Sequence, residues 1–271
     1  MSKDFSALGE RMKQYEFVSR GYLTRRVPVV IRLDGKAFHT FTKKMRRPFD
    51  RVLMTAMQKT MKMLCENIQG CVLGYTQSDE ITLVLTDYDT IHTDAWFEYN
   101  TQKMCSIAAS MATLAFNRAF EEEAGKLREA EETEWTSNYS VYEKKFYQAM
   151  FDARAFSVPK EEVCNCLIWR QQDATRNSIN AVGQANFSHK QLQGKNTDEV
   201  QDMLWREREI NWNDFPTDCK RGSCAYKVIQ ETEMPDPRNP EQMIRVKRRK
   251  WVVDNQIPIF TQDRNFVEQW L

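Results

Sequence analysis

The sequence contains no long apolar run, only three histidines and an odd number of cysteines, seven. No stretch approaches the roughly 20 apolar residues of a membrane-spanning helix, so we expect no membrane segment. Residues 1–17 also lack the apolar core of a signal peptide, which favours a cytoplasmic location. Several cysteines lie inside apolar patterns, as expected of free thiols that pack as small hydrophobes.

The cysteines and histidines do not indicate a zinc site. Cys164 and Cys166 are separated by one residue, where a zinc knuckle has two, and the histidines are too few to complete such a site. We therefore expect any metal in this protein to be a hard ion held by carboxylates.

Acidic and basic residues balance to a net charge of +1, but they are distributed unevenly. Residues 121–134 form an acidic block, whereas residues 245–250 (RVKRRK) are basic. Either segment could be a solvated helix face or an ordinary charged strand. The basic run could equally contact nucleic acid, because such binding depends on where the charge lies and not on its total.

The 271 residues, 41% hydrophobic and 28% charged, describe a globular chain with a buried core, and no repeat or long linker divides it. We therefore expect residues 1–271 to form one continuous unit. Hydrophobic periodicity predicts helices over residues 49–68, 104–120, 161–187 and 197–209. It predicts strands over residues 27–33, 72–75, 81–85, 223–232 and 244–254, the last two joined by a proline-rich loop over 234–240. The acidic block is expected to be exposed helix or loop.

Three carboxylates lie at the ends of predicted strands. Asp34 follows the first strand, and Asp79 and Glu80 separate the next two, whose spacing suits a hairpin. If the first strand lies beside this hairpin, the carboxylates come together and can hold two Mg²⁺ ions, as phosphoryl-transfer sites require. Gly35 could add a backbone carbonyl to the same site. The alternative is that both segments are ordinary solvated turns.

Five segments resemble, in the same order, motifs of the tRNA-histidine guanylyltransferase family, and most closely those of its bacterial and archaeal "like" proteins. They are residues 31–39 (IRLDGKAFH), 74–80 (GYTQSDE), 169–173 (WRQQD), 192–194 (LQG) and 210–213 (INWN), the last followed by Arg221 and Gly222. The first two motifs together are the most specific. The ordered set spans most of the chain.

The resemblance implies an α/β (α+β) fold with a polymerase- or cyclase-like palm. Helices would flank a mixed antiparallel sheet, with helical and β-hairpin elements towards the C-terminus. Residues 1–155 would form the palm-like metal-binding part of a single catalytic unit, and residues 156–271 a helical and β-ribbon part that contacts RNA. By analogy, we expect a homotetramer that binds tRNA.

The activity that the resemblance implies is addition of nucleotides to the 5′ end of tRNA. Such an enzyme uses Mg²⁺, and two ions are expected. ATP first adenylylates a 5′-monophosphate, and the 3′-hydroxyl of an incoming nucleoside triphosphate, usually GTP, then attacks that end. Both steps develop charge on phosphate oxygens, which metals, arginines and lysines neutralise.

Matching the motifs residue by residue implies roles for single side chains. Asp34 and Asp79, with the Gly35 carbonyl, would hold metal, and Glu80 would be a third catalytic carboxylate. The implied nucleotide contacts are Arg32, Lys36, Ala37, Phe38, His39, Arg47, Ser78, Lys103 and Asn177. Apart from the motifs, basic residues of the C-terminal half would contact RNA phosphates if they share one face: Lys190, Lys195, Lys220, Arg221, Arg245, Lys247 and Arg249.

Three of these assignments have plain structural alternatives. His39 could pack half-buried beside the neighbouring phenylalanines. Arg32 could pair with Asp34 or Glu80, which is compatible with either role. Lys103 could be a solvated helix lysine.

The chain departs from the family at residues 175–181 (TRNSINA), where eukaryotic guanylyltransferases carry HINNLYN. Thr175 replaces the histidine, while Asn177 keeps one polar position. The departure is typical of the "like" branch, whose members restore missing 5′ nucleotides on truncated tRNAs under the direction of a template. Base pairing then selects each nucleotide, and the protein needs to recognise only the shape and the end of the RNA. The alternatives are addition of one G to tRNA-histidine, nucleotide cyclisation, and RNA binding without catalysis.

Overall fold

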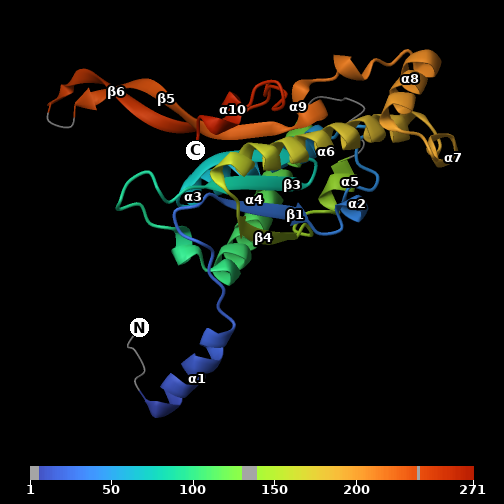
Figure 1. The fold of residues 1–271 in the computed structure, drawn as a ribbon. Coiled ribbons are helices and arrows are strands. Elements are labelled where there is room, and N and C mark those ends of the chain that lie inside the picture. The colour runs from blue at the N-terminus through green and yellow to red at the C-terminus, as the bar shows by residue number, and fades with distance from the viewer. Residues whose placement is uncertain (1–5, 130–138, 237–238) are drawn as a thin grey trace.

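A six-stranded sheet forms the centre of the computed structural model, which describes residues 6–129, 139–236 and 239–271 (Figure 1). The strands lie in the order β4-β1-β3-β2-β5-β6, and every neighbouring pair is antiparallel. Their bounds are β1 Val29–Gly35, β2 Cys71–Gln77, β3 Glu80–Leu85, β4 Phe151–Ser157, β5 Ser223–Asp236 and β6 Asn239–Asp254. The predicted α/β fold with an antiparallel sheet is confirmed.

Helices lie on both faces of this sheet. The α-helices are α1 Ala7–Val18, α2 Phe38–Phe41, α3 Arg51–Asn67, α4 Thr101–Glu129, α5 Tyr139–Glu143, α6 Lys160–Asn186, α7 His189–Leu192, α8 Thr197–Arg208, α9 Thr217–Arg221 and α10 Asn265–Glu268. Short 3-10 helices are η1 Trp96–Tyr99 and η3 Trp212–Asp214. No helix of the described residues is both long and apolar enough to cross a membrane.

The two faces of the sheet carry different cores because successive side chains of a strand point to opposite sides. Ile31 and Leu33 of β1 pack with the buried side chains of α3 and α4. On the other face Tyr75 of β2 packs with Val163 and Leu167 of α6. In Figure 1, α6 crosses the sheet at the level of β3, whereas β1 and β4 lie below it. The opposite face of β1 carries Arg32 and Asp34, both of which are partly buried.

Several predicted boundaries are corrected by the structure. β5 and β6 continue through most of the predicted proline-rich loop, where Pro235 pairs with Met243, and they form a ribbon that projects from the body (Figure 1). Residues 121–129 of the acidic block continue α4, and residues 130–134 lie outside the described residues. β4 and α1 were not predicted. α1 buries none of its residues and projects from the opposite side of the body.

Candidate active site

The end of β1 and the tip of the β2–β3 hairpin lie side by side. Asp34 and Glu80 are directly opposite each other in the β1–β3 pairing. Asp79 lies in the turn of the hairpin, and its carbonyl accepts a hydrogen bond of 3.1 Å from the Gly35 N–H. The sequence prediction that these strand ends meet is therefore confirmed.

Gly35 allows the turn after β1 to lie directly on the core. A Cβ at this position would lie 2.3 Å from the Phe38 ring, far inside normal contact distance. The Phe38 ring is buried against Phe41, Phe116 and Phe151, with ring centres 4.9–5.4 Å apart. Packing thus fixes the backbone that carries Asp34 and the Gly35 carbonyl.

Burial and a neighbouring charge perturb the Asp79 carboxylate. Burial raises the pKa of Asp79, the nearby Asp34 raises it further, and the Ser78 hydroxyl, which donates a 3.0 Å hydrogen bond to it, opposes the rise. Two carboxylates that crowd each other in a half-buried site are stabilised by a shared cation. These residues therefore fit a divalent metal ion.

The ligand set at this place is small. Among residues 6–129, 139–236 and 239–271, no group of three or more His, Cys, Asp or Glu side chains is arranged to hold a metal. A site of two carboxylates and one carbonyl leaves most positions around the ion to water and substrate oxygens. Mg²⁺ favours such a site, since it keeps several waters and binds substrate phosphates.

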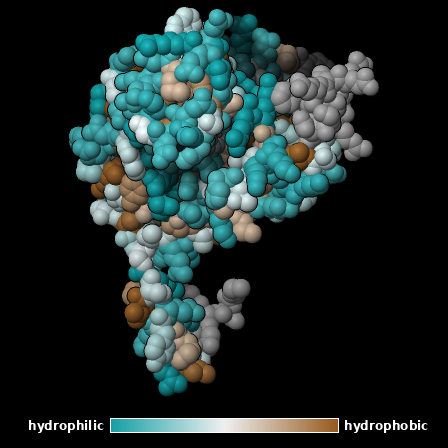
Figure 2. Space-filling view, turned by 90° about the vertical axis from the view of Figure 1, so that its right-hand side faces the viewer, coloured by the Kyte–Doolittle hydropathy of each residue, from teal (hydrophilic) through white to brown (hydrophobic). Residues whose placement is uncertain are grey.

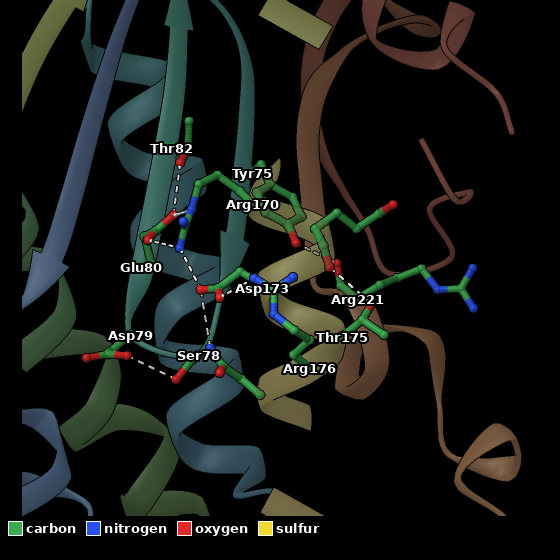
Figure 3. A network of polar contacts seen from close by, with 12 residues as sticks. Tyr75, Ser78, Asp79, Glu80, Thr82, Arg170, Asp173, Thr175, Arg176 and Arg221 are labelled. Atoms are coloured by element: carbon green, nitrogen blue, oxygen red, sulfur yellow. Dashed lines mark hydrogen bonds and ion pairs between the residues drawn. The ribbon is translucent and has the colours of Figure 1, made fainter. Parts of the chain in front are cut away.

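The Glu80 carboxylate is engaged by an arginine that sequence reasoning did not assign. Arg170 of α6 donates to both Glu80 oxygens at 2.7 Å, and to Asp173 at 2.9 Å (Figure 3). Both side chains of the Arg170–Glu80 pair are only 8% exposed. Burial raises the pKa of Glu80, and Arg170 opposes this. This bidentate ion pair ties α6 to the hairpin. The signal in the sequence was the position of Arg170 inside the 169–173 motif.

Arg32 lies on the same face of the sheet but pairs with neither carboxylate. Its Nε is buried and has no hydrogen-bond partner, and its guanidinium lies 5.6 Å from the ring centre of Trp169. No ion pair within the described part of the chain joins Arg32 to Asp34 or Glu80. A guanidinium with a buried, unpartnered Nε–H, two residues from Asp34, is suited to an anionic ligand.

Ser78 and Asn177, assigned to nucleotide binding, line one cavity of about 140 Å³. The cavity lies beside the hairpin tip and is bounded by Pro48, Phe49 and the segment 218–222. Gly222 fits there because its φ is +84° and a Cβ would meet the Thr76 carbonyl at 2.3 Å. Neither the cavity nor this glycine's role could be inferred from local sequence patterns.

The other residues predicted to contact nucleotide do not line this cavity. Lys36 and Ala37 are exposed in the turn after Gly35, and His39 is exposed in α2, so His39 is not half-buried. Arg47 lines a separate cavity beside α7. Lys103 is apart from this centre.

The distance of Lys103 follows from its place in α4. Its ammonium lies 5.9 Å from the Phe97 ring centre, near the start of the helix. Thr113, ten residues later, accepts a hydrogen bond from the Phe151 N–H, which lies opposite Gly35. Ten residues of α-helix span about 15 Å. The structure therefore does not bring Lys103 together with the carboxylates.

The cations assigned to RNA fall into two places. Lys190 and Lys195 lie around α7, whereas Arg245, Lys247 and Arg249 lie on the ribbon. Arg221, at the end of α9, lines the same cavity as Ser78 and Asn177, and Lys220 next to it is buried. Several of these charges are already neutralised by ion pairs: Arg245–Glu233 at 2.9 Å, Lys247–Glu231 at 3.6 Å and Lys195–Glu199 at 3.1 Å.

Comparisons with known proteins identify the family of this chain. Residues 9–159 match the family model described as tRNAHis guanylyltransferase. A bacterial tRNA(His) guanylyltransferase-like protein solved in complex with ATP is 43% identical, with a TM-score of 0.80 over 97% of this chain and 98% of that one. Another structure, of such a protein in complex with GTP, is 40% identical, with a TM-score of 0.76 over 98% and 99%.

Curated relatives point to the same family. The tRNA(His) guanylyltransferase of Schizosaccharomyces pombe is 26% identical over 95% of this chain and 93% of its own length. Since the family model matches more than half of the 271 residues, the assignment does not depend on any single relative. The chain belongs to the tRNAHis guanylyltransferase family, which comprises nucleotidyltransferases that add nucleotides in the 3′-to-5′ direction.

Proposed function

We propose that the protein is a metal-dependent, template-directed nucleotidyltransferase that restores missing nucleotides at the 5′ end of truncated tRNA. The observation that carries this is the meeting of Asp34, the Gly35 turn and Asp79 at adjoining strand ends, beside a cavity lined by Ser78 and Asn177. A template-directed reaction is supported by Thr175, which stands where guanylyltransferases that add a single G have histidine. The Thr175 hydroxyl donates to the Gln171 carbonyl of its own helix at 3.0 Å.

The carboxylates would hold two Mg²⁺ ions together with the Gly35 carbonyl. Bound metal would activate the attacking oxygen and neutralise charge on the reacting phosphate. Arg32 would supply a further positive charge from the sheet face, where its Nε has no protein partner. Glu80 would act indirectly, because its oxygens are already engaged by Arg170, and would fix the hairpin that positions Asp79.

The cavity of about 140 Å³ would hold the nucleoside part of ATP or of the incoming triphosphate. Apolar Phe49 and Met54 would contact the flat base, and Ser78 and Asn177 would offer hydroxyl and amide groups to its edge or its sugar. The relatives solved with ATP and with GTP support binding of both nucleotides.

Residues 1–155 would form the palm-like catalytic part, and residues 156–271 would add the surfaces that contact tRNA. The exposed cations of the α7 region and of the ribbon support this division. We also propose, by analogy with the family, that the protein acts as a homotetramer in the cytoplasm.

The test combines Mg²⁺, ATP, the four nucleoside triphosphates and a 5′-monophosphorylated tRNA that lacks its first nucleotide. An Asp79→Asn protein is assayed in parallel. Extension by the nucleotide complementary to the unpaired template base, absent in the variant, supports the proposal. Extension by G whatever the template base indicates the single-G guanylyltransferase reaction instead. RNA that remains unchanged, with intact ATP, would overturn a catalytic role.

A further inference from the structure

A second and larger cavity, of about 500 Å³, lies between the C-terminal half of α6, α7 and the loop that carries Arg47. Its polar lining consists of Arg47, Asn180, Gln184, His189, Gln193 and Lys195. Its apolar wall is formed by Phe187, Leu192 and Val200. Gln193 belongs to the 192–194 motif, to which neither the catalytic centre nor the smaller cavity gives a role.

The walls of this cavity are fixed by packing and hydrogen bonds. A Cβ at Gly183 would lie 2.8 Å from the Val200 side chain, so only glycine allows α6 and α8 this approach. A capping box between Ser188 and Gln191 starts α7 and orients His189. Gly194, with φ of +77°, turns the chain back towards α8.

The loop on the other side is also anchored. Asp50 is buried, caps α3 by accepting from the Leu53 N–H at 3.0 Å, and accepts from the Arg46 N–H at 3.0 Å. The Tyr142 hydroxyl donates to the same carboxylate at 2.6 Å. Arg47 therefore projects from a segment whose backbone is held at both ends.

The chemistry of the lining matches a phosphate-bearing nucleotide. No carboxylate lines the cavity within the described part of the chain, and three of its residues are basic or can carry positive charge. Lys195 is balanced by Glu199, whereas Arg47 and His189 have no ion-pair partner among the described residues. Three amide side chains can both donate and accept, as base edges require, and the apolar wall suits the face of a base.

The position of the cavity indicates which nucleotide it would take. Pro48 and Phe49 line the smaller cavity, and Arg47, next in the chain, lines this one. Along α6, Asn177 faces the smaller cavity, while Asn180 and Gln184 lie about 4.5 and 10 Å further along. The two cavities are therefore neighbours. Residues 189–191 of α7, Lys190 among them, are exposed. The face of the molecule shown in Figure 2 is mainly hydrophilic.

We propose that this cavity binds a nucleotide of the RNA strand next to the reacting end, with its phosphate at Arg47 and His189. The amides, Gln193 among them, contact its base or sugar. The inference rests on the proposed function and extends it, since it assigns His189 and the 192–194 motif to the path of the RNA. The exposed polar face beside the cavity offers a continuing strand a route away from it.

The test measures binding and catalysis separately. His189→Ala and Gln193→Ala are compared with His92→Ala and Gln262→Ala, which replace exposed residues outside every cavity described here. Fluorescence anisotropy gives the affinity for a labelled 5′-monophosphorylated tRNA without nucleotide, and calorimetry gives the affinity for ATP without RNA. Loss of a hydrogen bond to phosphate should weaken RNA binding about 10-fold in His189→Ala, and loss of an amide contact about 5-fold in Gln193→Ala.

The expected result is weaker RNA binding by both variants, with ATP affinity within about twofold of wild type. RNA affinities equal to those of the controls would overturn the assignment. A loss of ATP affinity with unchanged RNA affinity would identify the cavity as a site for free nucleotide and would equally overturn it. Failure of the wild-type protein to extend RNA would count against the proposed function, whereas these affinities report on the cavity in either case.

Discussion

Replacing Arg170 is expected to destabilise the protein, because the Glu80 carboxylate then stays buried without its partner. In Arg170→Met, Glu80 would remain in a site that is 8% exposed, without the two 2.7 Å hydrogen bonds that now hold it. Breaking a buried ion pair from one side costs about 3–5 kcal/mol, because the remaining charge has no compensation. The control is Arg176→Ala, because the Arg176 side chain is 52% exposed and contacts Asp173 at 2.9 Å. An exposed pair of this kind contributes about 1 kcal/mol or less.

Urea unfolding at constant protein concentration would give both values. The double variant Glu80→Gln, Arg170→Met should recover part of the loss, since it removes both charges. Equal losses in Arg170→Met and Arg176→Ala would refute the argument that burial makes this pair important. A double variant less stable than Arg170→Met would refute the claim that the uncompensated Glu80 charge is the cause.

Further predictions concern the metal, the pH, the catalytic turn and the ribbon. Mg²⁺ at 100 times its dissociation constant should stabilise the protein by about 2.7 kcal/mol. Calorimetry should show this as a rise in Tm of about 5–10 °C, which Asp79→Asn should abolish. Without metal, the raised pKa of Asp79 means that the folded state binds its proton more tightly than the unfolded state does. As pH rises from the usual carboxyl pKa through the raised one, the free energy of unfolding of wild type should therefore fall relative to that of Asp79→Asn. Urea midpoints of the two proteins that change with pH by the same amount would contradict this. Gly35→Ala should lower the free energy of unfolding by about 1–3 kcal/mol and remove most of the activity, because its methyl group would overlap a buried ring. Gly125→Ala is the control: a Cβ there would meet nothing within 4 Å, so this change should stabilise α4 by up to about 1 kcal/mol. If the ribbon contacts RNA, Arg249→Ala should lower the salt dependence of RNA binding by about one phosphate contact. Arg245→Ala should lower it less, because Arg245 is already paired with Glu233. A larger effect of Arg245→Ala than of Arg249→Ala would exclude this mode of contact.

The elements around the catalytic centre could be predicted because local signals agree there. The apolar strand before Asp34 and the spacing of the hairpin strands define β1, β2 and β3 without reference to distant residues. Antiparallel neighbours then bring their ends together, and the DG and SDE turns follow. The resemblance to a family added the roles of these residues, which the turn sequences alone leave open.

The partners of these residues could not be predicted, since they depend on long-range contacts. Arg170 reaches Glu80 across 90 positions of the chain, and its place in the 169–173 motif marks the residue without identifying its partner. In the same way, Glu233 neutralises Arg245 because the ribbon pairs their strands. The predicted loop was wrong for residues 234–236 and 239–240, which are strand, because proline is tolerated in an exposed two-stranded ribbon, where no third strand needs its N–H. Residues 237 and 238 lie outside the described residues.

The 27 residues of α6 make it a rod about 40 Å long. Arg170 connects this rod to the hairpin of the carboxylates, Asn177 faces the smaller cavity, and Asn180 and Gln184 face the larger one. Distances between these places are thus set by helical pitch and not by flexible loops. One inserted residue between Arg170 and Asn177 would rotate everything beyond it by about 100° and turn both sets of amides away from their cavities. The number of residues between these positions of α6 therefore sets the spacing of the hairpin contact and the two cavities.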